Sequence, residues 1–223
     1  MIDWMLSAQN DVARLPELVW QQWWLRAGWS VVLAWLAVWS VSLRTTRQEV
    51  KRAAAIGSAV WVWLPGSWGG AYWLGLAFQA PSMITVLLCA LLGGRMLRQP
   101  THADHSHHVW PGHLIFWVLC GIALGWTLLL DTLGVWPSSF YNWGFGAVAP
   151  AIALGIAVLP WIFATKALPS RSVTAVAAAT LLFVALRLPT GNLFDALMDP
   201  WLWCALQLAL IQQWRHRVKA ASR

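Results

Sequence analysis

The sequence predicts an all-α fold, a polytopic transmembrane helix bundle of about seven spans with the N-terminus outside and the C-terminus in the cytoplasm. Three observations support this prediction. Hydrophobic residues make up 59% of the 223 residues and charged residues only 10%, against roughly half and a quarter in soluble domains. The mean hydropathy is +0.59. The chain also contains 20 Trp, and a soluble domain of this size could not bury so much apolar surface.

Seven stretches are apolar over close to the 20 residues or so that a membrane helix needs. These predicted spans are 27–43, 53–70, 71–94, 113–130, 144–165, 172–188 and 200–214. The second span is the weakest of them, because Pro65 and Gly66 interrupt it. The last span is short.

Three of the segments outside the predicted spans have a distinct composition. Residues 1–26 mix Trp and Leu with charged residues and contain Pro16, which predicts a bent amphipathic segment lying on the outer membrane interface. Residues 95–112 form a His-rich cytoplasmic loop, and residues 215–223 form a basic cytoplasmic tail.

The distribution of Lys and Arg predicts the orientation, because cytoplasmic loops carry an excess of both. With seven spans and the N-terminus outside, most basic residues fall inside: Arg44, Arg47, Lys51, Arg52, Arg95, Arg98, Lys166, Arg171, Arg215, Arg217, Lys219 and Arg223. If 53–64 were a re-entrant piece instead, this bias would be lost. The net charge of +7 is therefore mostly a topology signal. The expected partners are the lipid bilayer of a bacterial-type inner membrane and other membrane subunits, and no nucleic acid is expected.

The predicted spans hold almost no ionisable residues, which disfavours proton pumps, ion-coupled carriers, retinal proteins and b-type haem proteins. Their mid-depth polar residues, Gln79 and Ser82, flank Pro81. A proline removes a backbone hydrogen bond and frees a carbonyl, which in a membrane must find a partner or line a cavity. Two interpretations follow: a kink that opens a small cavity, or the more common packing kink satisfied by Ser82 or a neighbouring helix.

Small residues recur every four positions in two spans, at Ala147, Ala151 and Gly155 and again at Ala175 and Ala179. Such spacing allows helices to approach closely. We expect contacts inside the bundle, with a subunit interface as the alternative.

The outer side has two further features. Asp131, Arg187 and Asp195 gather in the outer loops, which predicts an ion pair of Arg187 with one of the carboxylates, or a polar site at the outer mouth. Most Trp residues also fall in the outer half, which favours a wide interfacial girdle over an aromatic platform for a flat hydrophobic ligand or a partner.

The strongest chemical signal is a run of histidines with one aspartate: His102, Asp104, His105, His107, His108 and His113. Imidazole and carboxylate ligands suit zinc, nickel, copper and cobalt, and His-rich tracts are typical of metal binding. The piece His102-Ala-Asp104-His105 is similar to the His-Ala-x-Asp-x-Asp-His signature of nickel/cobalt permeases, although one Asp is missing and the spacing differs. The resemblance implies a divalent transition metal, whereas a solvated polar loop that binds metals weakly is the plainer interpretation.

No catalytic constellation is apparent, so we do not expect an enzyme. The sequence favours a non-enzymatic subunit, anchor or assembly factor of a larger membrane complex. The alternative is a small divalent-cation permease with the His-rich loop as a cytoplasmic collecting site.

Overall fold

The computed structural model describes residues 15–98, 112–135, 137, 139–162 and 171–221. These residues contain no strand, so the expected all-α class is confirmed for them. The α-helices are α2 (Leu18–Ser42), α3 (Gln48–Trp63), α4 (Gly70–Phe78), α5 (Met83–Arg98), α6 (Gly112–Thr132), α7 (Val148–Ile162), α8 (Arg171–Leu186), α9 (Leu193–Leu197) and α10 (Pro200–Ala221). Two 3-10 helices accompany them, η1 (Gly66–Trp68) and η2 (Tyr141–Phe145).

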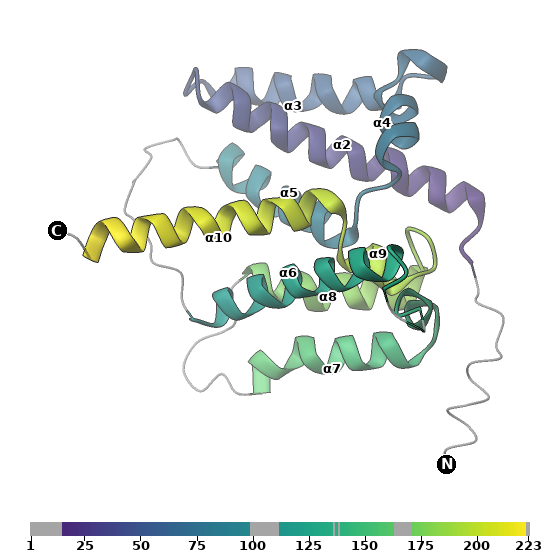
Figure 1. The fold of residues 1–223 in the computed structure, drawn as a ribbon. Helices are drawn as coiled ribbons and strands as arrows, with labels where there is room; N and C mark the ends of the chain where they lie inside the picture. The colour runs from purple at the N-terminus through teal and green to yellow at the C-terminus, as the bar shows by residue number, and fades with distance from the viewer. Residues whose placement is uncertain (1–14, 99–111, 136, 138, 163–170, 222–223) are drawn as a thin grey trace.

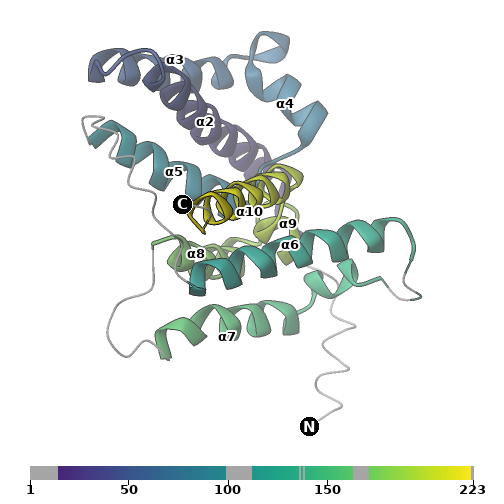
Figure 2. The same ribbon diagram turned by 60° about the vertical axis from the view of Figure 1, so that its left-hand side comes forward.

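The longer helices form an antiparallel stack. Seven have at least 15 residues, namely α2, α3, α5, α6, α7, α8 and α10, and consecutive members run in opposite directions (Figure 1). Helix α2 packs on α3 and α5, α5 packs on α8, α8 packs on α7, and α10 packs on α6. Turning the molecule shows α10 between the α2–α5 side and the α6–α8 side (Figure 2).

The two ends of the stack differ in chemistry. The turn between α2 and α3 and the C-terminal ends of α5 and α10 lie together on the left in Figure 1. This basic end carries Arg44, Arg47, Arg95, Arg98, Arg215 and Arg217. The start of α2, the end of α3 and the short helices α4, α9 and η2 lie at the opposite end. This aromatic end exposes Trp20, Trp23, Trp63, Trp68, Trp73 and Trp143.

Helix α2 begins earlier than the predicted first span. It starts at Leu18, two residues after Pro16, and continues without a break to Ser42. Pro16 precedes the N-cap residue Glu17 and so lies outside the helix, where it interrupts no helical hydrogen bond. The region 18–26 contains no further breaker. The expected boundary between an interfacial segment (1–26) and the first span is therefore not seen in the described part of the segment, where residues 18–26 are the first turns of α2.

Prolines end two helices at places that change the expected spans. Helix α3 stops at Trp63 because Leu64, which precedes Pro65, takes an extended conformation. The expected single span 71–94 is two helices, α4 and α5, separated by residues 79–82. Pro81 thus causes a complete break and not the expected kink.

Within the described ranges, two helices are long and apolar enough to cross a membrane, Leu18–Ser42 and Leu114–Thr132. Their most apolar windows are only 28% and 11% buried, whereas a core helix of a soluble protein would be mostly buried. Val148–Val158 and Thr174–Leu186 are shorter apolar helices. These features support membrane association of the chain.

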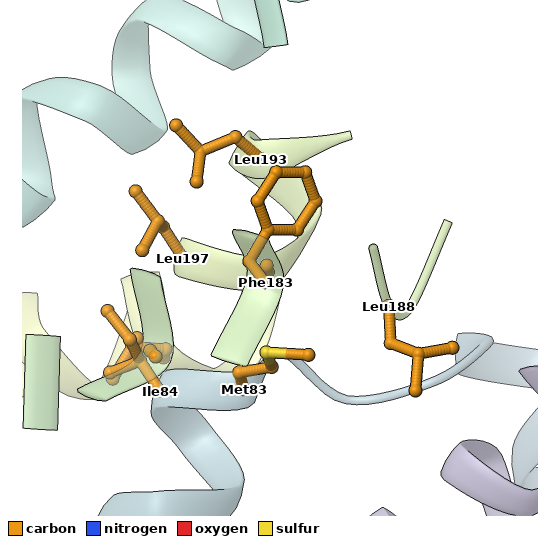
Figure 3. Close-up of a cluster of buried hydrophobic side chains, with 9 residues drawn as sticks. Met83, Ile84, Phe183, Leu188, Leu193 and Leu197 are labelled. Carbon is orange, nitrogen blue, oxygen red and sulfur yellow. The ribbon is translucent and has the colours of Figure 1, made fainter. Parts of the chain in front are cut away.

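The main core lies where α5, α8 and α9 meet. Met83, Phe183 and Leu193 are almost fully buried there and pack with Ile84 and Leu197 (Figure 3). A second core joins α2, α3 and α4 through Trp29, Val32, Val62, Ala71 and the α5 residue Cys89. Both cores adjoin the break between α4 and α5, so the packing surrounds that break.

The two small-residue faces have opposite environments. Ala175 and Ala179 of α8 are buried, as expected for contacts inside the bundle. Ala147, directly before α7, and Ala151 and Gly155 within it are exposed, and a Cβ atom added at Gly155 would meet nothing within 4 Å. The expectation of an internal contact is wrong for this second face, because α7 turns its other side, including the buried Ala157, toward the protein.

Candidate functional site

Side chains from other segments of the chain form hydrogen bonds with the break between α4 and α5 (residues 79–82). Helix α4 ends at Phe78, and Gln79 takes φ 58°, ψ −152°, a conformation that non-glycine residues rarely adopt. Helix α5 starts at Met83. Pro81 explains why the helix cannot continue, because it lacks an N–H and disfavours helical geometry at the residue before it.

Two tryptophans of α2 satisfy the carbonyl groups that the break frees. The indole N–H of Trp29 donates to the carbonyl of Gln79 at 2.7 Å, and that of Trp24 donates to the carbonyl of Pro81 at 3.0 Å. Buried indole N–H groups generally require such a partner. The carbonyls at the break therefore have partners on a neighbouring helix, the arrangement that an apolar environment demands.

Helix α2 also approaches the break closely. A Cβ atom added at Gly28 would lie 2.7 Å from Cγ of Pro81, so only glycine fits there without a shift. The ring of Trp29 lies 6.2 Å from that of Phe78, and Phe78 lies 4.8 Å from Trp201 at the start of α10. This aromatic row connects α2, α4 and α10 beside the break.

Asp199 holds the other side of the break. Its carboxylate accepts hydrogen bonds from the backbone N–H groups of Ser82 at 2.9 Å and of Leu202 at 2.7 Å. Asp199 directly precedes Pro200, the first residue of α10, and Ser82 directly precedes α5, where its Oγ accepts from the N–H of Thr85 at 3.2 Å. A carboxylate between two helix N-termini satisfies unpaired N–H groups and faces the positive ends of both dipoles.

The carboxylates of Asp131 and Asp195 are joined through Tyr141. The backbone N–H of Tyr141 donates to Asp131 at 2.8 Å, and its hydroxyl donates to Asp195 at 2.7 Å. Asp131 also accepts from the N–H of Phe140, and Asp195 from the hydroxyl of Thr190. Burial, followed by the hydrogen bond to Asp195, raises the pKa of the Tyr141 phenol.

Arg187 does not form the expected ion pair with Asp131 or Asp195, all three of which lie in the described part of the chain. Its guanidinium donates to the carbonyl of Phe145 at 3.4 Å and lies 5.4 Å from the ring centre of Phe183. Arg187 is thus directed toward Phe145 and Phe183, and the three residues do not form one polar site.

Asn192 fixes the buried segment between α8 and α10. Its side-chain oxygen caps α9 by accepting from the N–H of Phe194 at 2.8 Å, and its amide donates to the carbonyl of Tyr141 at 2.8 Å. A Cβ atom added at Gly144 would lie 1.9 Å from this oxygen. The segment is thus held against η2 by polar contacts that leave no room for a larger residue at position 144.

The candidate metal ligands His102, Asp104, His105, His107 and His108 lie outside the described residues. His113 is in the first turn of α6, and its side chain lies outside the description. Within the described ranges, no group of three or more His, Cys, Asp or Glu residues could hold a metal ion.

Sequence reasoning found Gln79, Pro81 and Ser82 but did not predict that Trp24, Trp29 and Asp199 contact this break. The pair Asp199-Pro200 carries a recognisable signal, since Asp is a favoured N-cap and Pro a favoured first helical residue. Trp24 and Trp29 gave no such signal, because their partners lie 57 and 50 positions away in the chain. Comparison with known proteins gives no match: no family model, curated protein or solved structure is significantly similar to the chain.

Proposed function

We propose that the protein is a multi-pass inner-membrane protein with seven spans, its N-terminus outside and its C-terminus in the cytoplasm. It acts as a non-enzymatic subunit, anchor or assembly factor of a larger membrane complex. The alternating direction of the seven longer helices supports the seven spans. The orientation is supported by the gathering of arginines at one end, because cytoplasmic loops are rich in Lys and Arg.

The short helices at the aromatic end support the same topology. Helices α3, α5, α7 and α8 have 15 or 16 residues, or about 24 Å of length, less than the roughly 30 Å of a bilayer core. Helices α4, α9 and η2 supply further backbone at this end. Non-helical backbone is tolerated at membrane depth where protein buries it, and most residues of 188–199 are buried.

The observation that carries the subunit role is the outward face of α7. Ala147, Ala151 and Gly155 repeat every four residues on an exposed surface. Small residues at this spacing let a second helix approach the backbone closely, and such faces are enriched at helix–helix interfaces in membranes. The partner that suits this face is therefore a transmembrane helix of another subunit.

The structural contacts of the three described aspartates support a non-enzymatic role. Asp131, Asp195 and Asp199 all accept hydrogen bonds from backbone, tyrosine or threonine groups. Such contacts connect segments of the protein and direct no acid or base toward a substrate.

Gly155→Leu tests the subunit role directly. A tagged protein is extracted in mild detergent and its native mass is measured. The wild type should elute in a stoichiometric complex with other membrane proteins, and Gly155→Leu should lose them because the side chain blocks close approach. Gly57→Leu is the matched control, since Gly57 is an exposed helical glycine with nothing within 4 Å of an added Cβ. A wild-type chain that runs alone at 24.9 kDa would contradict the proposal.

A further inference from the structure

An apolar pocket lies between α6 and the helices α5, α8 and α10. Its volume is about 180 Å³, and its walls include Ile84, Leu88, Leu114, Trp117, Cys120 and Leu206. Every lining residue is apolar, a cysteine or a glycine. A cavity of this chemistry offers no partners to hold water, so it favours an apolar occupant over water.

The way α6 packs produces this pocket. Gly121 allows Leu206 of α10 to approach closely, since a Cβ atom added there would lie 2.7 Å from Cδ1 of Leu206. Helix α6 therefore rests mainly on α10. The pocket follows one side of α6 from Leu114 to Leu124, which is about 15 Å of helix. Cys120, which lines the pocket, is exposed, so the pocket is open to the surroundings of the bundle.

Cationic groups lie beyond one end of the pocket. Leu114, near the start of α6, marks the end that faces the basic end of the bundle. Arg95 follows Leu88 by seven positions and so continues the same stripe of α5, with Arg98 one turn farther along. Both arginines are exposed. On α10, Arg217 follows Leu206 by eleven positions and is exposed too.

We infer that this pocket binds one acyl chain of an anionic phospholipid whose headgroup is held by Arg95 and Arg98. The inference rests on the proposed membrane location. An apolar slot accounts for the chain, and adjacent cations account for the headgroup charge, because basic clusters at the cytoplasmic side of membrane helices attract anionic lipids. A zwitterionic lipid would gain the apolar contact without the charge attraction.

The three cysteines provide a direct test. Cys120 lines the pocket and is exposed, Cys204 is exposed outside its lining, and Cys89 is buried. The purified protein in one detergent is titrated with phosphatidylglycerol or phosphatidylcholine and treated with a small maleimide, and modification of each cysteine is read by peptide mass spectrometry. Phosphatidylglycerol should slow modification of Cys120 several-fold more than phosphatidylcholine does, with Cys204 unchanged.

A matched pair of double variants separates the headgroup contact from general charge. Arg95→Gln/Arg98→Gln should abolish the extra protection by phosphatidylglycerol. Arg44→Gln/Arg47→Gln, at the same end of the bundle, should retain it. Equal protection by both lipids, or none, would overturn the inference. Resistance of the protein to carbonate extraction from membranes is measured in parallel, so a failed membrane location is distinguishable from a failed lipid site.

Discussion

The carboxylate of Asp199 accepts a hydrogen bond from the backbone N–H of Ser82, 117 positions earlier in the chain, at 2.9 Å. Its second oxygen caps α10 through the N–H of Leu202. One side chain therefore joins the first residues of two helices from distant parts of the sequence. Since Asp199 is only 9% exposed, water cannot readily replace it at either N–H.

Replacing Asp199 should destabilise the bundle, and the effect should be larger when both of its oxygen acceptors are removed than when one remains. Asp199→Ala leaves two buried N–H groups without a partner, and we expect a loss of about 1–3 kcal/mol. Asp199→Asn retains one oxygen acceptor, so its loss should be smaller. Thermal unfolding in detergent, followed by Trp fluorescence, measures both. Exposed Glu49 gives the control, Glu49→Gln, which should leave the midpoint unchanged. An Asp199→Ala protein as stable as the wild type would contradict this role.

The indole donors of α2 lead to a second prediction. Trp29→Phe keeps an aromatic ring in the core but removes the donor to the Gln79 carbonyl. The free energy of unfolding should fall by about 1–2 kcal/mol, within the range for hydrogen bonds between membrane helices. Trp24→Phe should act in the same direction through Pro81. Trp68→Phe is the comparison, because Trp68 is 81% exposed. Equal midpoints for all three variants would mean that these indole bonds contribute nothing to stability.

The break at Pro81 could be predicted from the sequence, but its partners could not. A proline within an apolar run marks where a helix must be interrupted, and that much is local information. The roles of Trp24, Trp29 and Asp199 depend on how α2 and α10 approach the break, which is set by tertiary packing. The local sequence therefore predicted where the helix is interrupted but suggested only a kink. The helix ends completely there, because Gln79 also has a non-helical backbone conformation.

Small-residue spacing was equally ambiguous. Ala175–Ala179 and Ala147–Ala151–Gly155 look alike in sequence, yet the first pair is buried and the second set is exposed. Such a repeat shows that another helix can approach closely, but not whether that helix belongs to the same chain. In this protein, α7 packs mainly against α8. Similarly, opposite charges in the outer loops suggested an ion pair, but backbone N–H groups and Tyr141 are nearer to the carboxylates.

Tyr141 should titrate at unusually high pH. The chain has only two tyrosines, so Tyr72→Phe leaves Tyr141 as the sole source of tyrosinate absorbance. Burial and the bond to Asp195 raise its pKa above the usual value of about 10. In that background, Asp195→Asn should lower the pKa of Tyr141 because the negative charge of the carboxylate is removed, while the contribution of burial remains.

The same shift has a consequence for stability. Because the folded protein holds this proton more tightly than the unfolded chain, the contribution of Tyr141 is fully present below about pH 10 and is lost as pH rises toward the folded pKa. Tyr141→Phe should therefore show a shallower decline in unfolding temperature across that window. A steep decline identical to that of the wild type would exclude Tyr141 as its cause.

Substitutions in the His-rich loop test the competing permease function. His102, His105, His107 and His108 are changed together to Ala, and nickel, cobalt and zinc are counted in the purified protein and in cells dependent on uptake. A permease with a collecting site there should lose bound metal and metal-dependent growth, because imidazole is the main ligand type that the loop offers. His216→Ala, which removes the one histidine outside the cluster, is the control and should change neither. Unchanged uptake in the fourfold variant would exclude the collecting site, while a fall in bound metal without a growth defect would leave only a metal-binding loop on a protein of another function.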